Sequence, residues 1–124
     1  MSIYKKSVDK NTENKPTRFY SSKQENKVAK LTGSKTTANS GATNWSKGDI
    51  SSDKFLIECK TKTSHSDSIS IKKEWIIKLR QESLFMGKKY EALVFNFGPD
   101  EENFAIIDMD LFNTLKDLLE NEKE

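Results

Sequence analysis

Three residues near the middle of the chain have the types and spacing of a site for a divalent metal ion. Glu58 and Lys60 lie in a segment where apolar and other residues alternate, as in a β-strand, so both side chains share one face. Asp49 belongs to the preceding segment, and a turn at residues 51–53 would pair the two segments as a hairpin. Carboxylate oxygens are ligands that Mg²⁺ favours. A bound Mg²⁺ polarises a phosphodiester and lowers the pKa of its water, while an adjacent ammonium can orient that water.

The segments around this site predict one α/β domain over residues 18–124, preceded by a basic arm at residues 1–17. Their order is α-β-β-α-β-β-α, which gives a mixed sheet flanked by helices. In the second strand, Ile57 and Cys59 mark the face that belongs to the core. Trp75 is predicted to be a core residue of the middle helix and His65 a solvated loop residue. The expected elements are a helix over 23–31, a loop over 33–48, strands within 48–63, a helix over 72–86, strands over 92–97 and 104–107, and a last helix capped by Asp108 or Asp110.

Gly48-Asp49 followed by Glu58-Cys59-Lys60 resembles the PD-(D/E)XK nuclease motif, with glycine where the motif name has proline. Over roughly residues 20–97 the chain is most similar to the archaeal-type Holliday junction resolvases and their phage relatives. The resemblance implies a restriction-endonuclease-like core and a Mg²⁺- or Mn²⁺-dependent endodeoxyribonuclease that resolves branched DNA. It also implies that Lys60 sits by the attacking water and that the metal ligands are Asp49, Glu58, Glu25 and the backbone carbonyl of Cys59.

Each of these assignments has a competing interpretation. Glu58 and Lys60 could be a surface ion pair on a half-exposed sheet. Glu25 is the fourth residue of a Ser22-x-x-Glu pattern, so it could be part of a helix capping box. The loop at Ser40-Gly41 resembles the mobile serine loop of the resolvases, which implies a catalytic role for Ser40; apart from this resemblance, the interpretation as an ordinary polar loop residue is favoured.

The charges of the chain are segregated along its length, which is typical of a nucleic-acid-binding face beside a solvated one. Residues 1–89 carry 19 Lys and Arg against 9 Asp and Glu, whereas residues 90–124 carry 2 against 10. The alternative is that an acidic last helix simply balances the basic part. The candidate phosphate contacts are Lys47, Lys62, Lys72, Lys73, Lys78 and Arg80.

The expected partner is therefore DNA. We expect a homodimer that makes two symmetric cuts in it, with the dimer interface in residues 93–107. The alternatives are a nuclease of this type acting on a nick, flap or end, a non-catalytic nucleic-acid-binding module on the same fold, and a small protein-binding domain that uses the acidic last helix. No run reaches the ~18 apolar residues of a membrane span. The single cysteine, Cys59, excludes an internal disulfide and favours a cytoplasmic location, which would be the host cytoplasm for a phage protein.

Overall fold

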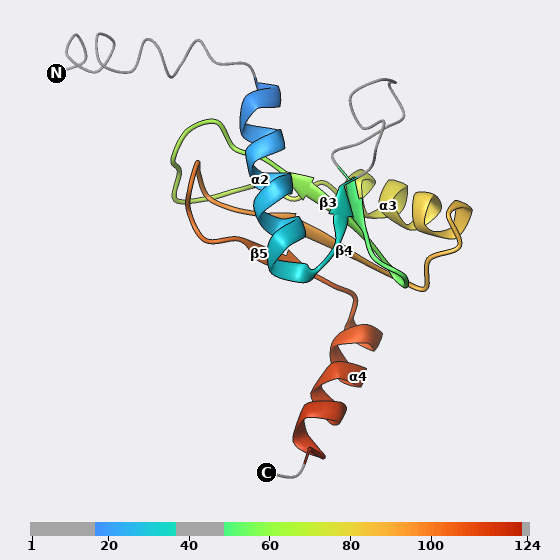
Figure 1. Ribbon diagram of the computed structural model, residues 1–124. Helices are drawn as coiled ribbons and strands as arrows, with labels where there is room; N and C mark the ends of the chain where they lie inside the picture. Colours follow the sequence, from blue (N-terminus) through green and yellow to red (C-terminus); the bar gives the residue numbers. More distant parts are fainter. Residues whose placement is uncertain (1–16, 37–48, 123–124) are drawn as a thin grey trace, which may run out of the picture.

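The computed structural model describes residues 17–36 and 49–122, which form a five-stranded sheet in the order β1-β2-β3-β4-β5 (Figure 1). Strands β3 and β4 are parallel, and the other neighbouring pairs are antiparallel. The predicted mixed α/β fold is therefore confirmed. In chain order the elements are α2 (Thr17–Thr32), β1 (Lys35–Thr36), β2 (Asp49–Ser51), β3 (Phe55–Lys60), α3 (Lys73–Phe85), β4 (Tyr90–Phe95), β5 (Phe104–Ile106) and α4 (Met109–Glu120).

The predicted order lacks one strand, β1, which lies in the segment predicted to be a loop. Its two residues pair with β2, with Lys35 opposite Ser51. A strand of this length has no alternation to detect. Residues 37–48 of that predicted loop lie outside the described part of the chain. The predicted arm also lies outside it, except for Thr17, where α2 begins.

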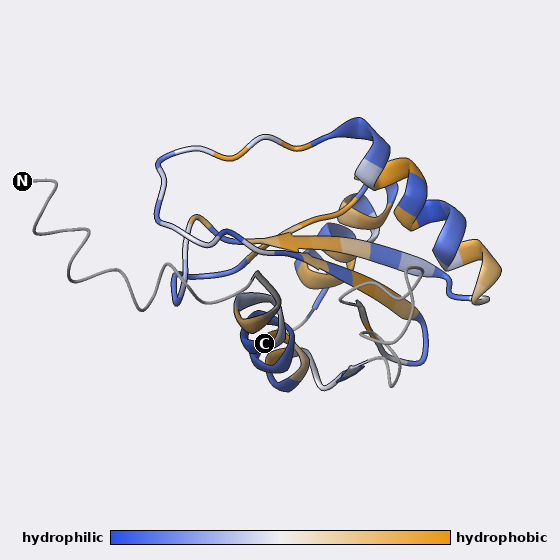
Figure 2. Ribbon diagram, turned by 90° about the horizontal axis from the view of Figure 1, so that it is seen from above, coloured by the Kyte–Doolittle hydropathy of each residue, from blue (hydrophilic) through white to orange (hydrophobic). Residues whose placement is uncertain are grey.

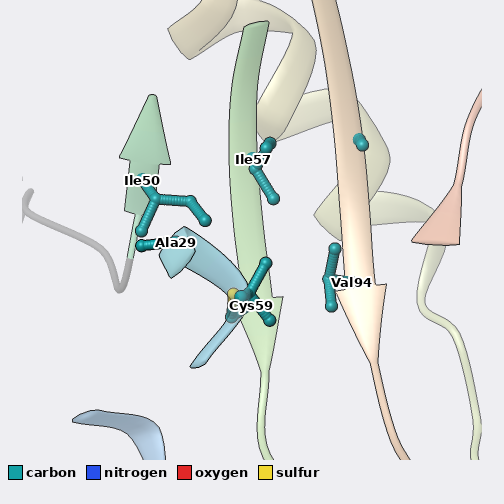
Figure 3. Packing of buried hydrophobic residues seen from close by; sticks show 7 residues of the cluster. Ala29, Ile50, Ile57, Cys59 and Val94 are labelled. Carbon is teal, nitrogen blue, oxygen red and sulfur yellow. The ribbon is translucent and has the colours of Figure 1, made fainter. Parts of the chain in front are cut away.

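The core is built on both faces of β3 and β4, because these central strands are covered on each side. On one face, Ile57 and Cys59 pack with Val94 and with Ala29 of α2 (Figure 3). On the other face, a smaller cluster joins strand residues to α3 through Leu79. Figure 2 shows the hydrophobic residues concentrated along these central strands. Helices α2 and α3 therefore cover opposite faces of the sheet.

Helix α2 starts earlier than the sequence indicates, and this corrects one expectation for Glu25. The capping-box interpretation requires Ser22 at the N-terminus of the helix, but Ser22 lies inside α2. The buried Tyr20 provides a tertiary contact that extends the helix toward the N-terminus. The helix ends as predicted before Gly33, whose φ of 67° favours glycine. Glu25 is thus a buried residue of the helix interior.

Helix α4 begins at the predicted cap, since the Asp108 carboxylate accepts a hydrogen bond of 2.8 Å from the Leu111 amide. The helix then leaves the sheet and points away from it (Figure 1). None of the helices in the described part of the chain has the length and apolar character that a membrane crossing requires.

Candidate functional site

Glu58 and Lys60 lie together on the α3 side of β3, as the alternation predicted. The Glu58 side chain is 7% exposed, and its Oε2 atom lies 2.9 Å from Lys60 Nζ. The Lys60 side chain is 27% exposed. A buried carboxylate is costly unless it is paired. The interpretation as a surface ion pair on a half-exposed sheet therefore does not fit, because the carboxylate is buried at the centre of the sheet.

Trp75, in the first turn of α3, is the third side chain of this site. It packs, partly buried, against the apolar cluster on the α3 side, as expected of a core residue. In addition, Lys60 Nζ lies 4.4 Å from the centre of its ring, which is a cation–π distance. Lys72, the N-cap residue of α3, places its Nζ atom 6.0 Å from the same ring. The Lys60 ammonium is thus held by a carboxylate and an indole face together.

The backbone of Asp49 lies on the strand next to Glu58, as predicted. In the antiparallel pair of β2 and β3, Asp49 is directly opposite Glu58, and Ile50 is opposite Ile57. Directly opposite positions in such a pair belong to the same face of the sheet. The side chain of Asp49 lies outside the described part of the structure, so its distance from the Glu58 carboxylate stays a prediction.

Glu25 belongs to the helix on the other face of the sheet, where α2 covers Ile57 and Cys59. Among the side chains that the structure describes, no three Asp, Glu, His or Cys residues gather closely enough to hold a metal ion. This set does not include Asp49. The Cys59 side chain is part of the core, and its carbonyl as a metal ligand stays a prediction, like the metal role of Glu25.

A buried polar network, which the sequence analysis missed, fixes the end of β3 next to this site. The Gln24 amide nitrogen donates to the Lys60 carbonyl at 3.0 Å and to Asn103 Oδ1 at 3.1 Å. Its amide oxygen accepts from Thr61 Oγ1 at 2.6 Å, and Asn96 Nδ2 donates to Asn103 Oδ1 at 3.2 Å. The network ties α2 to the strand end that carries Lys60. The available sequence signal was a glutamine one helical turn before the inward-facing Val28.

The predicted phosphate contacts fall into three groups. Those of α3 and its N-cap, namely Lys72, Lys73, Lys78 and Arg80, are all exposed. Arg80 also lies 3.5 Å from Glu91 on β4. Lys62 follows the end of β3 and lines a small pocket together with residues of α2. Because it lies beyond the strand, the alternation along β3 does not predict which way its side chain points. Lys47 lies outside the described residues, as does the predicted catalytic Ser40.

The rim of this small pocket carries two ion pairs. Lys23 of α2 lies 2.8 Å from Asp100, in the turn after β4. The hydrogen bond from Lys23, and then its charge, lower the pKa of Asp100 below its ordinary value of 3.8. His65, which was expected to be merely solvated, pairs on the surface with Glu101. Both pairs are far more exposed than the pair at Glu58 and Lys60.

Comparison with known proteins adds no further constraint: no family model, no curated protein and no solved structure matches the chain. The chemistry of the site therefore has to be argued from its own residues. The site combines two carboxylate positions, the buried Glu58 and Asp49 directly opposite it. The partly exposed Lys60 is an adjacent cation. This donor set fits a hard divalent cation such as Mg²⁺ or Mn²⁺.

Proposed function

We propose that the chain is a metal-dependent DNA endonuclease of the PD-(D/E)XK type that acts on branched DNA. The observation that carries the proposal is the position of Glu58, directly opposite Asp49 in the hairpin and 2.9 Å from Lys60. The path of the chain also supports it, since the hairpin β2–β3 is followed by α3 and by β4 parallel to β3. The restriction-endonuclease-like core is part of this proposal.

In this proposal Asp49, Glu58 and the Cys59 carbonyl hold Mg²⁺ or Mn²⁺. A bound ion would polarise the scissile phosphodiester and lower the pKa of a water molecule. Lys60 orients that water and offsets the negative charge that develops on the phosphate oxygens. Its ammonium has three N–H donors, of which Glu58 takes one, and its partial exposure leaves the others accessible to the substrate.

Basic residues near this site favour DNA as the substrate. Lys72 shares the Trp75 ring with Lys60, and the exposed Lys73 lies beside it at the start of α3. A phosphate backbone held here would reach the ammonium of Lys60. Because such contacts are to phosphates, binding should weaken steeply with salt concentration. A homodimer would present two such sites to a four-way junction.

The deciding experiment is the cleavage of labelled four-way junctions, flaps, nicked duplexes and linear duplexes, with Mg²⁺ or Mn²⁺ and with EDTA. Junctions should be cut only with the metal ion. Lys60→Ala should abolish cutting, whereas Lys54→Ala, an exposed lysine in the turn before β3, should not. Cutting of flaps or nicks alone would assign another DNA substrate to the same nuclease. Metal-independent binding without any cleavage would leave a non-catalytic module and reject the proposal.

A further inference from the structure

Helix α4 carries an apolar stripe that starts in the protein body and runs out into solvent. Its side chains are Leu111, Phe112, Leu115, Leu118 and Leu119, which at ~100° per residue span an arc of roughly 120°. Leu111 is 5% exposed, but Leu115 is 39%, Leu118 65% and Leu119 69% exposed. The stripe is therefore continuous with the core at one end and uncovered along the rest of the helix.

The rest of the described chain does not cover this stripe. Helix α4 points away from the sheet (Figure 1), and none of the described strands or helices packs along its length. A helix of 12 residues is marginal in water by itself, since most helical stability in proteins comes from packing an amphipathic face. The stripe therefore needs a partner outside the described chain.

The charge pattern of α4 favours a second copy of the chain as that partner. The acidic residues Asp110, Asp117 and Glu120 lie on the side of the helix away from the stripe, whereas Thr114 and Lys116 border it. Two identical stripes can therefore meet without bringing carboxylates together. A basic partner on the stripe would find the acidic side chains turned away from it.

Two alternatives fit less well: the N-terminal segment as the occupant of the stripe, and residues 93–107 as the dimer interface. The N-terminal segment at residues 1–16 is mostly polar, with only Met1, Ile3, Tyr4 and Val8 as larger apolar residues to fill a leucine-rich stripe. The segment at residues 93–107, which was expected to form a dimer interface, is largely used within the chain itself. Leu93 and Val94 are each buried in one of the two core clusters. Phe104, on β5, is 43% exposed.

We infer that two copies of this chain pair through α4, apolar stripe against apolar stripe, about a two-fold axis. The inference stands on α4 alone and does not depend on the nuclease proposal, so each can fail without the other.

The test is sedimentation equilibrium of the full chain, between about 1 and 100 µM. The unmodified chain should be a dimer in this range. Leu118→Glu should weaken pairing by at least about tenfold, because it places a charge inside the apolar contact. Leu84→Glu is the matched control, since Leu84 is another exposed helical leucine, 79% exposed on α3, and this variant should stay dimeric. Leu118 is 65% exposed, so the fold of the monomer should survive, as circular dichroism will verify.

Hydrogen exchange gives a second, independent measurement. The α4 amides should be protected in the dimer and should lose protection in Leu118→Glu, while β3 and β4 stay protected in both. A monomeric unmodified chain, or equal weakening by Leu84→Glu and Leu118→Glu, would overturn the inference. Protection of α4 in a monomer that disappears when residues 1–16 are removed would also overturn it and would identify that segment as the occupant.

Discussion

The two faces of β3 are built for different purposes, although their residues alternate along one strand. On the α2 side, Ile57 and Cys59 are enclosed by apolar side chains. On the α3 side, Leu56 is buried in a small apolar cluster, and the next two residues on that face are Glu58 and Lys60. The first face therefore stabilises the fold, while the second gives up apolar packing to hold a charged pair.

This difference bears on the role of the pair. A buried ion pair often contributes less to stability than well-packed apolar side chains of similar volume, because both charges lose hydration. An apolar residue in place of Glu58 would extend the cluster of Leu56, Leu79 and Leu93. The charged pair is thus better explained by chemistry than by stability, and substitutions on the two faces should separate these roles.

The largest expected effect is loss of cleavage in Glu58→Gln. This substitution should lower the rate with Mg²⁺ by about 10³-fold or more, because a lost metal ligand removes several kcal/mol of charge stabilisation. Stability should change by only about 1 kcal/mol, because removing a buried charge offsets the loss of its pairing and Lys60, which is 27% exposed, can be hydrated. Single-turnover cleavage and urea unfolding measure the two quantities.

The matched control is Glu91→Gln on β4. Glu91 is opposite Leu56 and pairs with Arg80, so it is a partly buried carboxylate on a neighbouring strand. Cleavage in this variant should stay within a few fold of the unmodified rate. A similar loss of cleavage in both variants would mean that the carboxylates act through general electrostatics or folding, and the site assignment would have to be abandoned.

The next effect belongs to the other face, where Ile57→Ala should lower stability without removing the chemistry. Deleting this buried side chain should cost about 3 kcal/mol in the free energy of unfolding. The folded variant should still cleave, since Glu58 and Lys60 face the opposite way. Urea unfolding should show only a small change for Ile77→Ala, because Ile77 is 46% exposed on α3. Loss of cleavage in fully folded Ile57→Ala would contradict the separation of the faces.

A smaller effect is expected at Trp75, which positions Lys60. Trp75→Leu should slow cleavage about fivefold to tenfold, because a cation–π contact contributes about 1 kcal/mol. Trp75→Phe keeps an aromatic face for the ammonium and should recover most of the rate. Should Leu and Phe give equal rates at equal stability, the contact with Lys60 would have no role in positioning.

The sequence was sufficient for features that depend on local pattern. Alternation along β3 separated Ile57 and Cys59 from Glu58 and Lys60, and the turn after β2 predicted the hairpin. The same local reasoning misplaced the start of α2. A capping-box pattern also occurs inside a helix, and only the buried Tyr20 shows that the helix continues toward the N-terminus.

Other parts of the site depend on contacts between segments that are distant in the sequence. The ring of Trp75 meets Lys60 only because α3 crosses the face of β3. Gln24 binds the Lys60 carbonyl and Asn103, which requires α2, β3 and the segment before β5 to be assembled. The local sequence places Gln24 one helical turn before Val28 but does not identify the partners of either contact, so neither contact could be predicted without the sheet topology.

The smallest expected effect is at the rim of the α2 side, where Asp100→Asn removes the ion pair with Lys23. Asp100 has a φ of 64°, and asparagine tolerates this left-handed conformation, so the substitution removes charge without backbone strain. The pKa of Asp100 is lowered in the folded state by its hydrogen bond with Lys23, so the pair stabilises the fold only while the carboxylate is charged. This contribution is complete above the ordinary pKa of 3.8 and disappears as the pH falls through the lower folded pKa.

Thermal melts of the unmodified chain and of Asp100→Asn should therefore differ slightly at pH 7 and converge in acid. The pair is exposed, so a large difference at pH 7, or one that persists in strong acid, would show that Asp100 acts through something other than Lys23.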